Sequence, residues 1–374
     1  MVAITLDEVT VRHGRQRPAL DEVHLQVASG ELLVVAGPSG SGKTTLLRTI
    51  AGLEHPERGT VSIAGRDVTD AAPGERDVAM VSESRALLSH LTVEENLGFA
   101  LRLRKVPADE TRRRVEAEAR VLGLWSKRRR RPRVLSAGER QRTAIGRATA
   151  RRPAVYLFDE PLAALDPGER DRVRRELQQL QRGLGVTTVY VTHDQRDAMA
   201  LGDRVAILDR GRIVQVADPL TLYHDPRTLF VAQFIGAPPM GVLRGQLRDD
   251  GTTAWVDVHG VALRLLPEQR VALSGSPPTT VAVALRASAV EVGNLPRHPW
   301  SRQLATVVAH VEPLGSATVL ALTPRGATPT TALLYATVPP TRRPVRGEAI
   351  TVTLDMRESI LFDAASGRRL FPLH

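Results

Sequence analysis

A glycine-rich segment between Gly37 and Thr44 carries the residue types that bind a phosphate chain. It follows the apolar run Leu32 to Ala36, which predicts a buried strand, then a loop, then a helix that begins near Lys43. Glycines allow successive backbone N–H groups to face one phosphate, and the helix N-terminus adds a favourable dipole. Lys43 can then reach the β- and γ-phosphates of ATP, and the Thr44 hydroxyl can ligate Mg²⁺. The flanking strand and helix make a chance match in a glycine-rich turn the weaker interpretation.

A second apolar run, Ala154 to Phe158, predicts another buried strand and ends in Asp159 and Glu160. An acid at the end of a strand parallel to the phosphate-loop strand can hold Mg²⁺, and we assign this role to Asp159. Glu160 is then placed to polarise the water that attacks the γ-phosphate. By itself Glu160 would be interpreted as an exposed carboxylate at a helix start, but Asp159 and the phosphate loop favour the catalytic role.

Four further segments resemble motifs of the ATP-binding cassette (ABC) family. Residues 135–142, LSAGERQR, resemble the family signature LSGGQ and the basic helix that follows it. Residues 164–166 are similar to the D-loop, Val191 to Asp194 to the segment with the switch histidine, and Met80 to Ser84 stand in the place of the Q-loop. A single match would be weak evidence, whereas all of the motifs in family order are strong evidence.

The family resemblance implies a site built from two chains. Two cassettes face head to tail and enclose two ATP molecules, a closed twofold arrangement. Ser136 and Gly138 of one chain would bind the γ-phosphate that Ser39, Lys43 and Thr44 of the other chain also bind. The catalytic residues expected are Lys43, Glu160 and His193, the last of which stabilises the γ-phosphate and transition-state charge. The nucleotide-binding residues expected are His13, Ser39, Gly40, Gly42, Lys43, Thr44, Thr45, Glu83, Ser136, Gly138, Glu139 and Asp166, and the Mg²⁺ ligands expected are Thr44, Glu83 and Asp159.

Longer stretches resemble the ATPase subunit of carbohydrate-type ABC importers, the group that includes the maltose, trehalose and glycerol-phosphate systems. The resemblance covers essentially the whole chain and is close up to about Gly241. The stretches that carry it are Ala51 to Glu54, Leu91 to Asn96, Val191 to Gln195 with Ala198 and Met199, and Phe230 to Gly236.

The importer resemblance implies a protein at the cytoplasmic face of the cell membrane, attached through two transmembrane permease subunits and served indirectly by an extracytoplasmic substrate-binding protein. The second cassette is expected to be an identical copy of this chain, and pairing with a different cassette subunit is the alternative. The closing motion of the two cassettes would be passed to the permease through Glu83 and the segment Ala86 to Asn96. The apolar residues of this segment also fit the start of a buried helix, which is the alternative. A sugar or disaccharide is the preferred solute, with glycerol phosphate, polyamine or ion import as alternatives.

Glu83 stands where the family carries a glutamine. A carboxylate keeps an oxygen for Mg²⁺ but lacks N–H donors, and it adds negative charge near the γ-phosphate. Slower hydrolysis or a greater need for Mg²⁺ is therefore expected. The alternative is that Glu83 only ligates Mg²⁺ and the rate of hydrolysis changes little. A degenerate cassette that binds ATP without hydrolysing it becomes a rival function, opposed by the intact Lys43, Asp159, Glu160 and His193.

Two other departures lie in the signature and near the N-terminus. Ser136 and Glu139 form an S-x-x-E pattern, which predicts a capped helix whose N-terminus faces the phosphate. Ala137 fits only if its φ is negative, because a Cβ penalises positive φ.

His13 stands where the family offers an aromatic ring to adenine. Weaker stacking there predicts modest ATP affinity and poor discrimination against GTP, and an exposed loop histidine is the alternative.

The net charge of +10 and the pI of about 10.8 raise nucleic acid as a partner. The densest basic run, Lys127 to Arg133, is typical of a solvated loop. Electrostatic attraction of an incoming nucleotide, or of the anionic cytoplasmic leaflet of the membrane, is the alternative. Aromatic residues make up 3% of the chain, so stacking platforms are scarce and no nucleic acid is expected. No apolar run approaches the roughly 20 residues of a membrane span, and Met1 to Asp7 alternates like a strand rather than a signal peptide.

Strand and helix patterns alternate from residue 155 to 207, which predicts a parallel α/β sheet. Beyond about residue 237, short period-two strands such as Val256 to Val258 and Val261 to Leu265 flank His259-Gly260 like a hairpin. The fold class expected is α/β: a RecA-like P-loop ATPase core over residues 1–236, with a helical subdomain at about 86–152, and an OB-like regulatory domain over 237–374. The stretch around Arg286 departs from the family, so no regulator is assigned.

Overall fold

The computed structural model describes residues 2–14, 17–81, 87–163, 165–273, 278–293, 298–328 and 333–371. The contacts between residues within the chain divide the protein into two compact units, Met1–Pro219 and Leu220–His374. The segment 220–236 therefore belongs to the second unit by contacts. The functional boundary at residues 236 and 237 stays a prediction.

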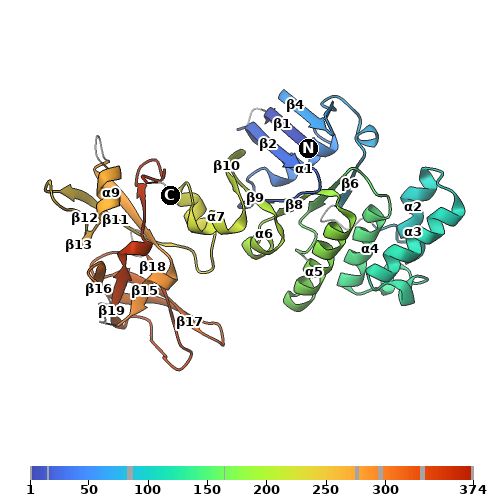
Figure 1. The fold of residues 1–374 in the computed structure, drawn as a ribbon. Helices are drawn as coiled ribbons and strands as arrows, with labels where there is room; N and C mark the ends of the chain where they lie inside the picture. The colour runs from blue at the N-terminus through green and yellow to red at the C-terminus, as the bar shows by residue number, and fades with distance from the viewer. Residues whose placement is uncertain are drawn as a thin grey trace. The chain divides into compact units, whose positions relative to one another are not determined.

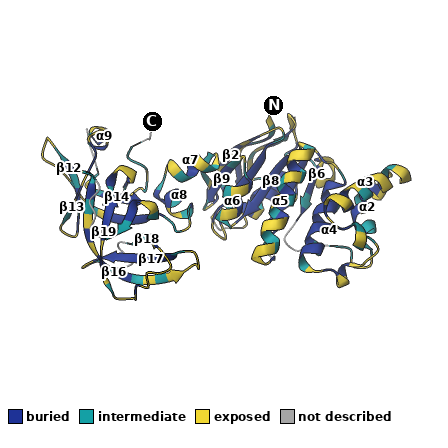
Figure 2. Cartoon of the chain, turned by 60° about the horizontal axis from the view of Figure 1, so that its bottom comes forward, coloured by how far each residue is buried: buried dark blue, intermediate teal, exposed yellow. Residues whose placement is uncertain are grey.

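The first unit is built on a six-stranded sheet in the order β10-β9-β3-β8-β7-β6. Its central strands β3, β7 and β8 are buried along their whole length, as expected for a parallel sheet covered on both faces (Figure 2). All neighbouring pairs are parallel except β9 and β10. The strands are β3 (Leu32–Ala36), β6 (Val78–Val81), β7 (Val155–Asp159), β8 (Thr187–Thr192), β9 (Arg204–Asp209) and β10 (Arg212–Ala217).

A second, antiparallel sheet in the first unit has the order β2-β1-β4-β5. Its apolar face shares one core with the faces of β3, β7 and β8, so helix α1 (Lys43–Ala51) is buried between the two sheets. The strands are β1 (Val2–Val11), β2 (Leu20–Ala28), β4 (Arg58–Ile63) and β5 (Arg66–Asp67).

Three of the helices form a group of their own, because α2 packs on α3 and α4 while α4 also contacts β6 and α5 (Figure 1). This helical group is inserted between strands β6 and β7 of the sheet. Among the residues that the structure describes, no helix is long and apolar enough to cross a membrane. The helices of the first unit are α1 (Lys43–Ala51), α2 (Val93–Leu103), α3 (Ala108–Val121), α4 (Ala137–Thr149), α5 (Pro167–Leu184) and α6 (Gln195–Leu201).

The second unit contains two five-stranded antiparallel sheets, in the orders β13-β12-β11-β14-β20 and β15-β19-β16-β17-β18. A bridge between Val242 and Leu333 joins the sheets, which gives a nearly closed barrel. The predicted hairpin at His259-Gly260 is confirmed, because Val258 pairs with Val261. The strands are β11 (Gly241–Asp249), β12 (Ala254–Val258), β13 (Val261–Arg264), β14 (Thr280–Leu285), β15 (Val290–Val292), β16 (Ser301–Pro313), β17 (Thr318–Pro324), β18 (Leu334–Val338), β19 (Ala349–Asp355) and β20 (Ile360–Asp363), and the helices are α7 (Pro219–His224), α8 (Leu229–Phe234) and α9 (Pro267–Ala272).

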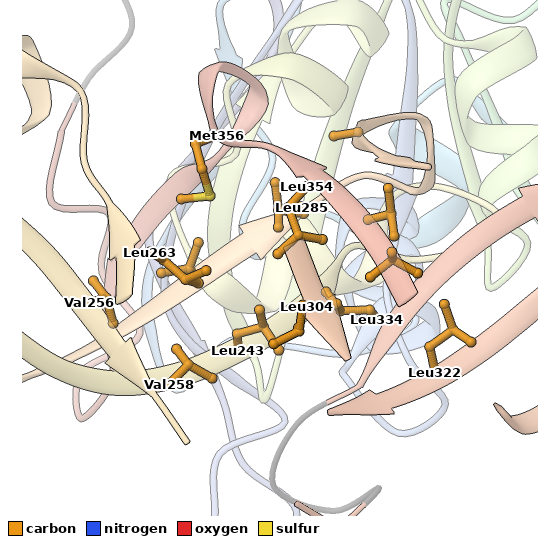
Figure 3. Packing of buried hydrophobic residues seen from close by; sticks show 14 of the residues in the cluster. Leu243, Val256, Val258, Leu263, Leu285, Leu304, Leu322, Leu334, Leu354 and Met356 are labelled. Carbon is orange, nitrogen blue, oxygen red and sulfur yellow. The ribbon is translucent and has the colours of Figure 1, made fainter. Parts of the chain in front are cut away.

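The core of the second unit draws apolar side chains from both of its sheets. Figure 3 shows Leu243, Val256 and Leu285 of the first sheet facing Leu304 and Leu354 of the second. Alternation of buried residues with partly or fully exposed ones along β12 and β16 places one face of each strand in this core. The β-rich, barrel-like architecture that the sequence pattern predicts is therefore confirmed.

Arg286 anchors the two short helices of the second unit to the barrel. It is 8% exposed, follows β14 directly, and donates to the backbone oxygens of Tyr223, Ala232 and Ile235. Its guanidinium also lies 4.1 Å from the centre of the Tyr223 ring. These contacts hold α7 and α8 against the end of β14.

Replacing Arg286 with methionine is expected to lower the free energy of opening of β14 by about 2–4 kcal/mol, since three buried carbonyls lose a charged donor. Hydrogen exchange of the β14 amides measures this change. Arg244→Met is the matched control, because Arg244 is exposed on the neighbouring strand β11. Equal exchange rates in the Arg286 variant and the control would contradict an anchoring role.

Candidate functional site

Three loops of the first unit leave neighbouring parallel strands at the same edge of the sheet. Strand β8 lies between β3 and β7, with Ala36 opposite Thr192 and Asp159 opposite Val191. The carboxyl ends of parallel strands are where open α/β sheets bind ligands. The phosphate-loop segment, the Asp159-Glu160 pair and the switch-histidine segment therefore converge at one edge.

The phosphate loop requires glycine at two positions for steric reasons. Gly42 has a φ of +105° directly before α1, and a Cβ there would overlap the Ala19 carbonyl oxygen. Gly37 has the same problem, because its Cβ would overlap the Leu208 carbonyl oxygen. No side chain caps the N-terminus of α1, and its first turn has no acidic residue. Backbone N–H groups and the helix dipole at this end therefore suit an anion.

Lys43 and Thr44 place a cation and a hydroxyl at this loop. The Lys43 ammonium, on a residue only 6% exposed, donates to the carbonyl oxygens of Gly37 at 3.0 Å and Pro38 at 2.8 Å. Burial lowers its pKa, and the Glu160 and Asp159 carboxylates act in the opposite direction. The Thr44 hydroxyl donates to Asp159 Oδ1 at 3.2 Å.

Glu160 and His193 are joined across the neighbouring ends of β7 and β8. The Glu160 carboxylate lies 2.8 Å from His193 Nδ1, and the Glu160 backbone N–H donates to the Val191 carbonyl at 3.0 Å. Glu160 also has a φ of +46°, an uncommon conformation for a residue with a side chain. A carboxylate on Nδ1 orients the imidazole and directs Nε2 to the opposite side of the ring.

The signature helix α4 begins with the predicted capping box. The Ser136 hydroxyl accepts from the Glu139 N–H, and the Glu139 carboxylate accepts from the Ser136 N–H at 3.0 Å. Glu139 is 8% exposed and also pairs with Lys127. Ala137 is the first helical residue, so the requirement for a negative φ is met. The N-terminus of α4 is thus rigid even though its sequence departs from the family.

Gly138 leaves room for a side chain of α5, the Glu169 carboxylate. A Cβ on Gly138 would overlap the Glu169 carboxylate, which also lies 3.8 Å from the Arg142 guanidinium. Glu169 is in the first turn of α5, whose N-cap is Asp166, and the Asp166 carboxylate accepts from the Glu169 N–H at 2.9 Å. The signature helix and the segment after the D-loop are therefore packed together.

Gly138→Ala is expected to lower ATP turnover by roughly tenfold, because the new methyl group displaces the Glu169 side chain and shifts the first turn of α4. The double variant Gly138→Ala with Glu169→Ala removes the clashing carboxylate and is expected to recover most of that loss. Steady-state turnover of both variants, with Glu169→Ala as the control, measures the effect. A double variant no better than Gly138→Ala would show that the methyl group acts elsewhere.

The remaining predicted nucleotide contacts are placed as follows. Ser39 and Gly40 are exposed on the phosphate loop, and Thr45 lies in the first turn of α1. His13 Nε2 is 3.3 Å from a Glu54 carboxylate oxygen, beyond the C-terminal end of α1. Glu83 lies outside the residues that the structure describes. Sequence reasoning missed two residues that bear on the site, Glu169 and Arg170, although their places in the first turn of α5, three and four residues after the N-cap Asp166, could have drawn attention to them.

Residues 20–163 match the family model described as ABC transporter. The chain is 42% identical to a trehalose/maltose import ATP-binding protein of Thermococcus litoralis, over 94% of this chain and 95% of that protein. It is 39% identical to an sn-glycerol-3-phosphate import ATP-binding protein of Paraburkholderia xenovorans, over 99% of each chain. It is 47% identical to a diacetylchitobiose uptake ATP-binding protein of Streptomyces coelicolor, over 67% of each.

A solved structure supports the same assignment for the first unit. A dimeric ATP-binding cassette in a post-hydrolysis state, bound to ADP and Pi, is 31% identical, with a TM-score of 0.53 over 58% of this chain and 98% of that chain. The sequence motifs, the converging strand ends and nearly full-length relatives lead to one conclusion. The chain belongs to the ABC transporter family, among the ATP-binding, ATP-hydrolysing subunits of importers for sugars and glycerol phosphate.

Proposed function

We propose that this protein hydrolyses MgATP to drive uptake of a sugar or disaccharide through partner permease subunits. The observation that carries the hydrolytic part is the convergence of Lys43, Asp159, Glu160 and His193 at one sheet edge. Pre-positioned charges and hydrogen-bonding groups are what phosphoryl transfer requires of a protein. The relatives that serve trehalose, maltose and diacetylchitobiose uptake support the choice of solute.

The residues present fit a Mg²⁺ site. Among the described residues, no group of three or more His, Cys, Asp or Glu side chains could hold a metal by itself. Mg²⁺ takes few protein ligands and keeps water and phosphate oxygens, and the adjacent Thr44 hydroxyl and Asp159 carboxylate supply suitable oxygen atoms. When bound, Mg²⁺ would neutralise charge on the phosphate chain.

Each residue of the converging loops has a separate task in the proposed reaction. Lys43 binds the β- and γ-phosphates, together with backbone N–H groups at the start of α1. Glu160 orients the attacking water and accepts its hydrogen bond. His193, held at Nδ1 by Glu160, presents Nε2 to the γ-phosphate.

We further propose that two copies of the chain pair head to tail. Ser136 caps and Gly138 lies in α4, which packs on β6, and two strands, β8 and β7, separate β6 from the phosphate-loop strand β3. One chain would therefore leave its own nucleotide without signature residues. The relative solved with ADP and Pi is a dimer. Ser136 and Gly138 of one copy would complete the γ-phosphate site of the other.

The same proposal places the protein at the membrane through two permease subunits, with a binding protein on the far side. Glycerol phosphate is the alternative solute, because a relative that serves sn-glycerol-3-phosphate import matches along nearly the full length. The two alternatives differ in solute charge, so transport assays can separate them.

ATP turnover of the protein purified with its co-expressed permease subunits tests the function. We expect a basal rate that rises when the binding protein is loaded with maltose, trehalose or diacetylchitobiose. Stimulation by glycerol 3-phosphate in place of these sugars would support the alternative. ATP binding without any turnover would contradict the hydrolytic assignment.

A further inference from the structure

Arg170 connects the loops that carry the two proposed catalytic side chains. It is the fourth residue of α5, three positions after the helix begins at Pro167. Its Nη1 donates to Asp194 Oδ2 at 2.6 Å, its Nε to the Leu162 carbonyl at 3.3 Å and its Nη2 to the Ala163 carbonyl at 3.4 Å. All three guanidinium nitrogens are therefore engaged.

The partners of Arg170 belong to two different loops. Leu162 and Ala163 follow Glu160, in a turn where the Ala163 N–H donates to the Glu160 carbonyl at 3.2 Å. Asp194 directly follows His193 at the end of β8. One planar side chain thus spans the loop after Glu160 and the loop after His193.

Asp194 is held in place by further hydrogen bonds, so its contact with Arg170 also constrains the position of the neighbouring His193. Its second carboxylate oxygen accepts from the Arg196 N–H at 2.7 Å and caps α6, and its own N–H donates to the Thr192 hydroxyl at 2.9 Å. The side chains of Arg170 and Asp194 are 22% and 23% exposed. A charged hydrogen bond of this kind, mostly shielded from water, is stronger than an ion pair on the surface.

We propose that Arg170 is a positioning residue that sets the relative placement of Glu160 and His193. The inference rests on the proposed roles of those two residues. The backbone contact from Glu160 to Val191 fixes only the strand ends, whereas the side-chain contact of 2.8 Å depends on both loops. The hydrogen bonds of Arg170 go to both loops and not to the side chains of Glu160 and His193 themselves. Its loss therefore disturbs the reacting geometry while the phosphate loop stays intact.

Arg174, one turn further along α5, provides a matched control. Its guanidinium pairs with Asp197 at 3.2 Å and Asp171 at 2.7 Å, and its side chain is 19% exposed. It is thus an equally shielded arginine on the same helix face, paired with a carboxylate of α6, but it does not bind either catalytic loop. A general loss of packing would affect both variants alike.

The experiment compares Arg170→Met, Arg170→Lys and Arg174→Met in the protein purified with its permease subunits. For Arg170→Met we expect kcat to fall by about 10- to 100-fold, since small misplacements of catalytic groups carry losses of this order. KM for ATP should stay within about twofold, because binding in the ground state is retained. Arg170→Lys should be intermediate, because an ammonium can pair with Asp194 but has no planar fork for two carbonyls. Arg174→Met should keep the wild-type kcat.

A second readout does not depend on turnover. The imidazole ¹⁵N signals of His193 report its hydrogen bond to Glu160, and we expect the Nδ1 signal to shift in Arg170→Met and to stay unchanged in Arg174→Met. If wild-type protein fails to hydrolyse ATP, the proposed function fails, while the shift in this signal still supports Arg170 as a positioning residue. Unchanged His193 signals in Arg170→Met, an unchanged kcat, or an equal loss of kcat in Arg174→Met would overturn the proposal.

Discussion

Glu160→Gln is expected to lower ATP turnover by about 10²- to 10⁴-fold, the usual contribution of a positioned base. The amide keeps the shape of the side chain but accepts hydrogen bonds more weakly and carries no charge to polarise water. ATP binding should be retained, since Lys43 and the backbone of the phosphate loop are unaltered. Parallel assays of turnover and of ATP affinity measure the two effects.

Glu57→Gln is the matched control for this variant, because Glu57 is 53% exposed and pairs with Arg12 on the surface. It should hydrolyse ATP at the wild-type rate. If Glu160→Gln retains more than about a tenth of wild-type turnover, its share of the barrier falls below about 1.4 kcal/mol and another group must orient the water.

Lys43→Ala is expected to lower kcat/KM for ATP by at least about 100-fold, because a preorganised charge on the phosphates is lost. Unlike Glu160→Gln, this change should also weaken ATP binding. The buried ammonium lies in the field of Asp159 and Glu160, so its removal leaves two carboxylates facing the phosphate chain without compensation. Titration of ATP binding by calorimetry measures the change in affinity.

Lys105→Ala is the control for loss of a lysine, since Lys105 is exposed in the turn after α2. It should bind and hydrolyse ATP normally. ATP affinity in Lys43→Ala equal to that of the control would mean that the lysine does not contact the bound phosphates.

Local features of the site could be predicted from sequence because contiguous residues determine them. The strand, loop and helix around Lys43, the capping box at Ser136 and Glu139, and the hairpin at His259 all arise from neighbours in the chain. The requirement that Ala137 have a negative φ follows from its own Cβ and is met. The parallel sheet then follows from alternating strand and helix patterns.

Contacts between distant residues could not be predicted in the same way. No local pattern shows that Glu169 lies against Gly138, or that Arg170 reaches both Asp194 and the carbonyls after Glu160. These contacts depend on how α5 packs against α4 and α6. The pairing of His13 with Glu54 likewise joins residues from separate elements. His13 as an adenine contact and Glu83 as a metal ligand stay predictions.

The composite head-to-tail site is tested most directly by mixing two defective chains that both carry Glu160→Gln, so that bound ATP persists. One chain adds Lys43→Ala and keeps its signature, and the other adds Ser136→Arg and keeps its phosphate loop. Sedimentation velocity with MgATP measures their association. Head-to-tail pairing predicts that neither chain associates by itself and that the mixture forms dimers, because one intact phosphate loop then meets one intact signature. Association of either chain by itself, or no association in the mixture, would contradict a site shared between two chains.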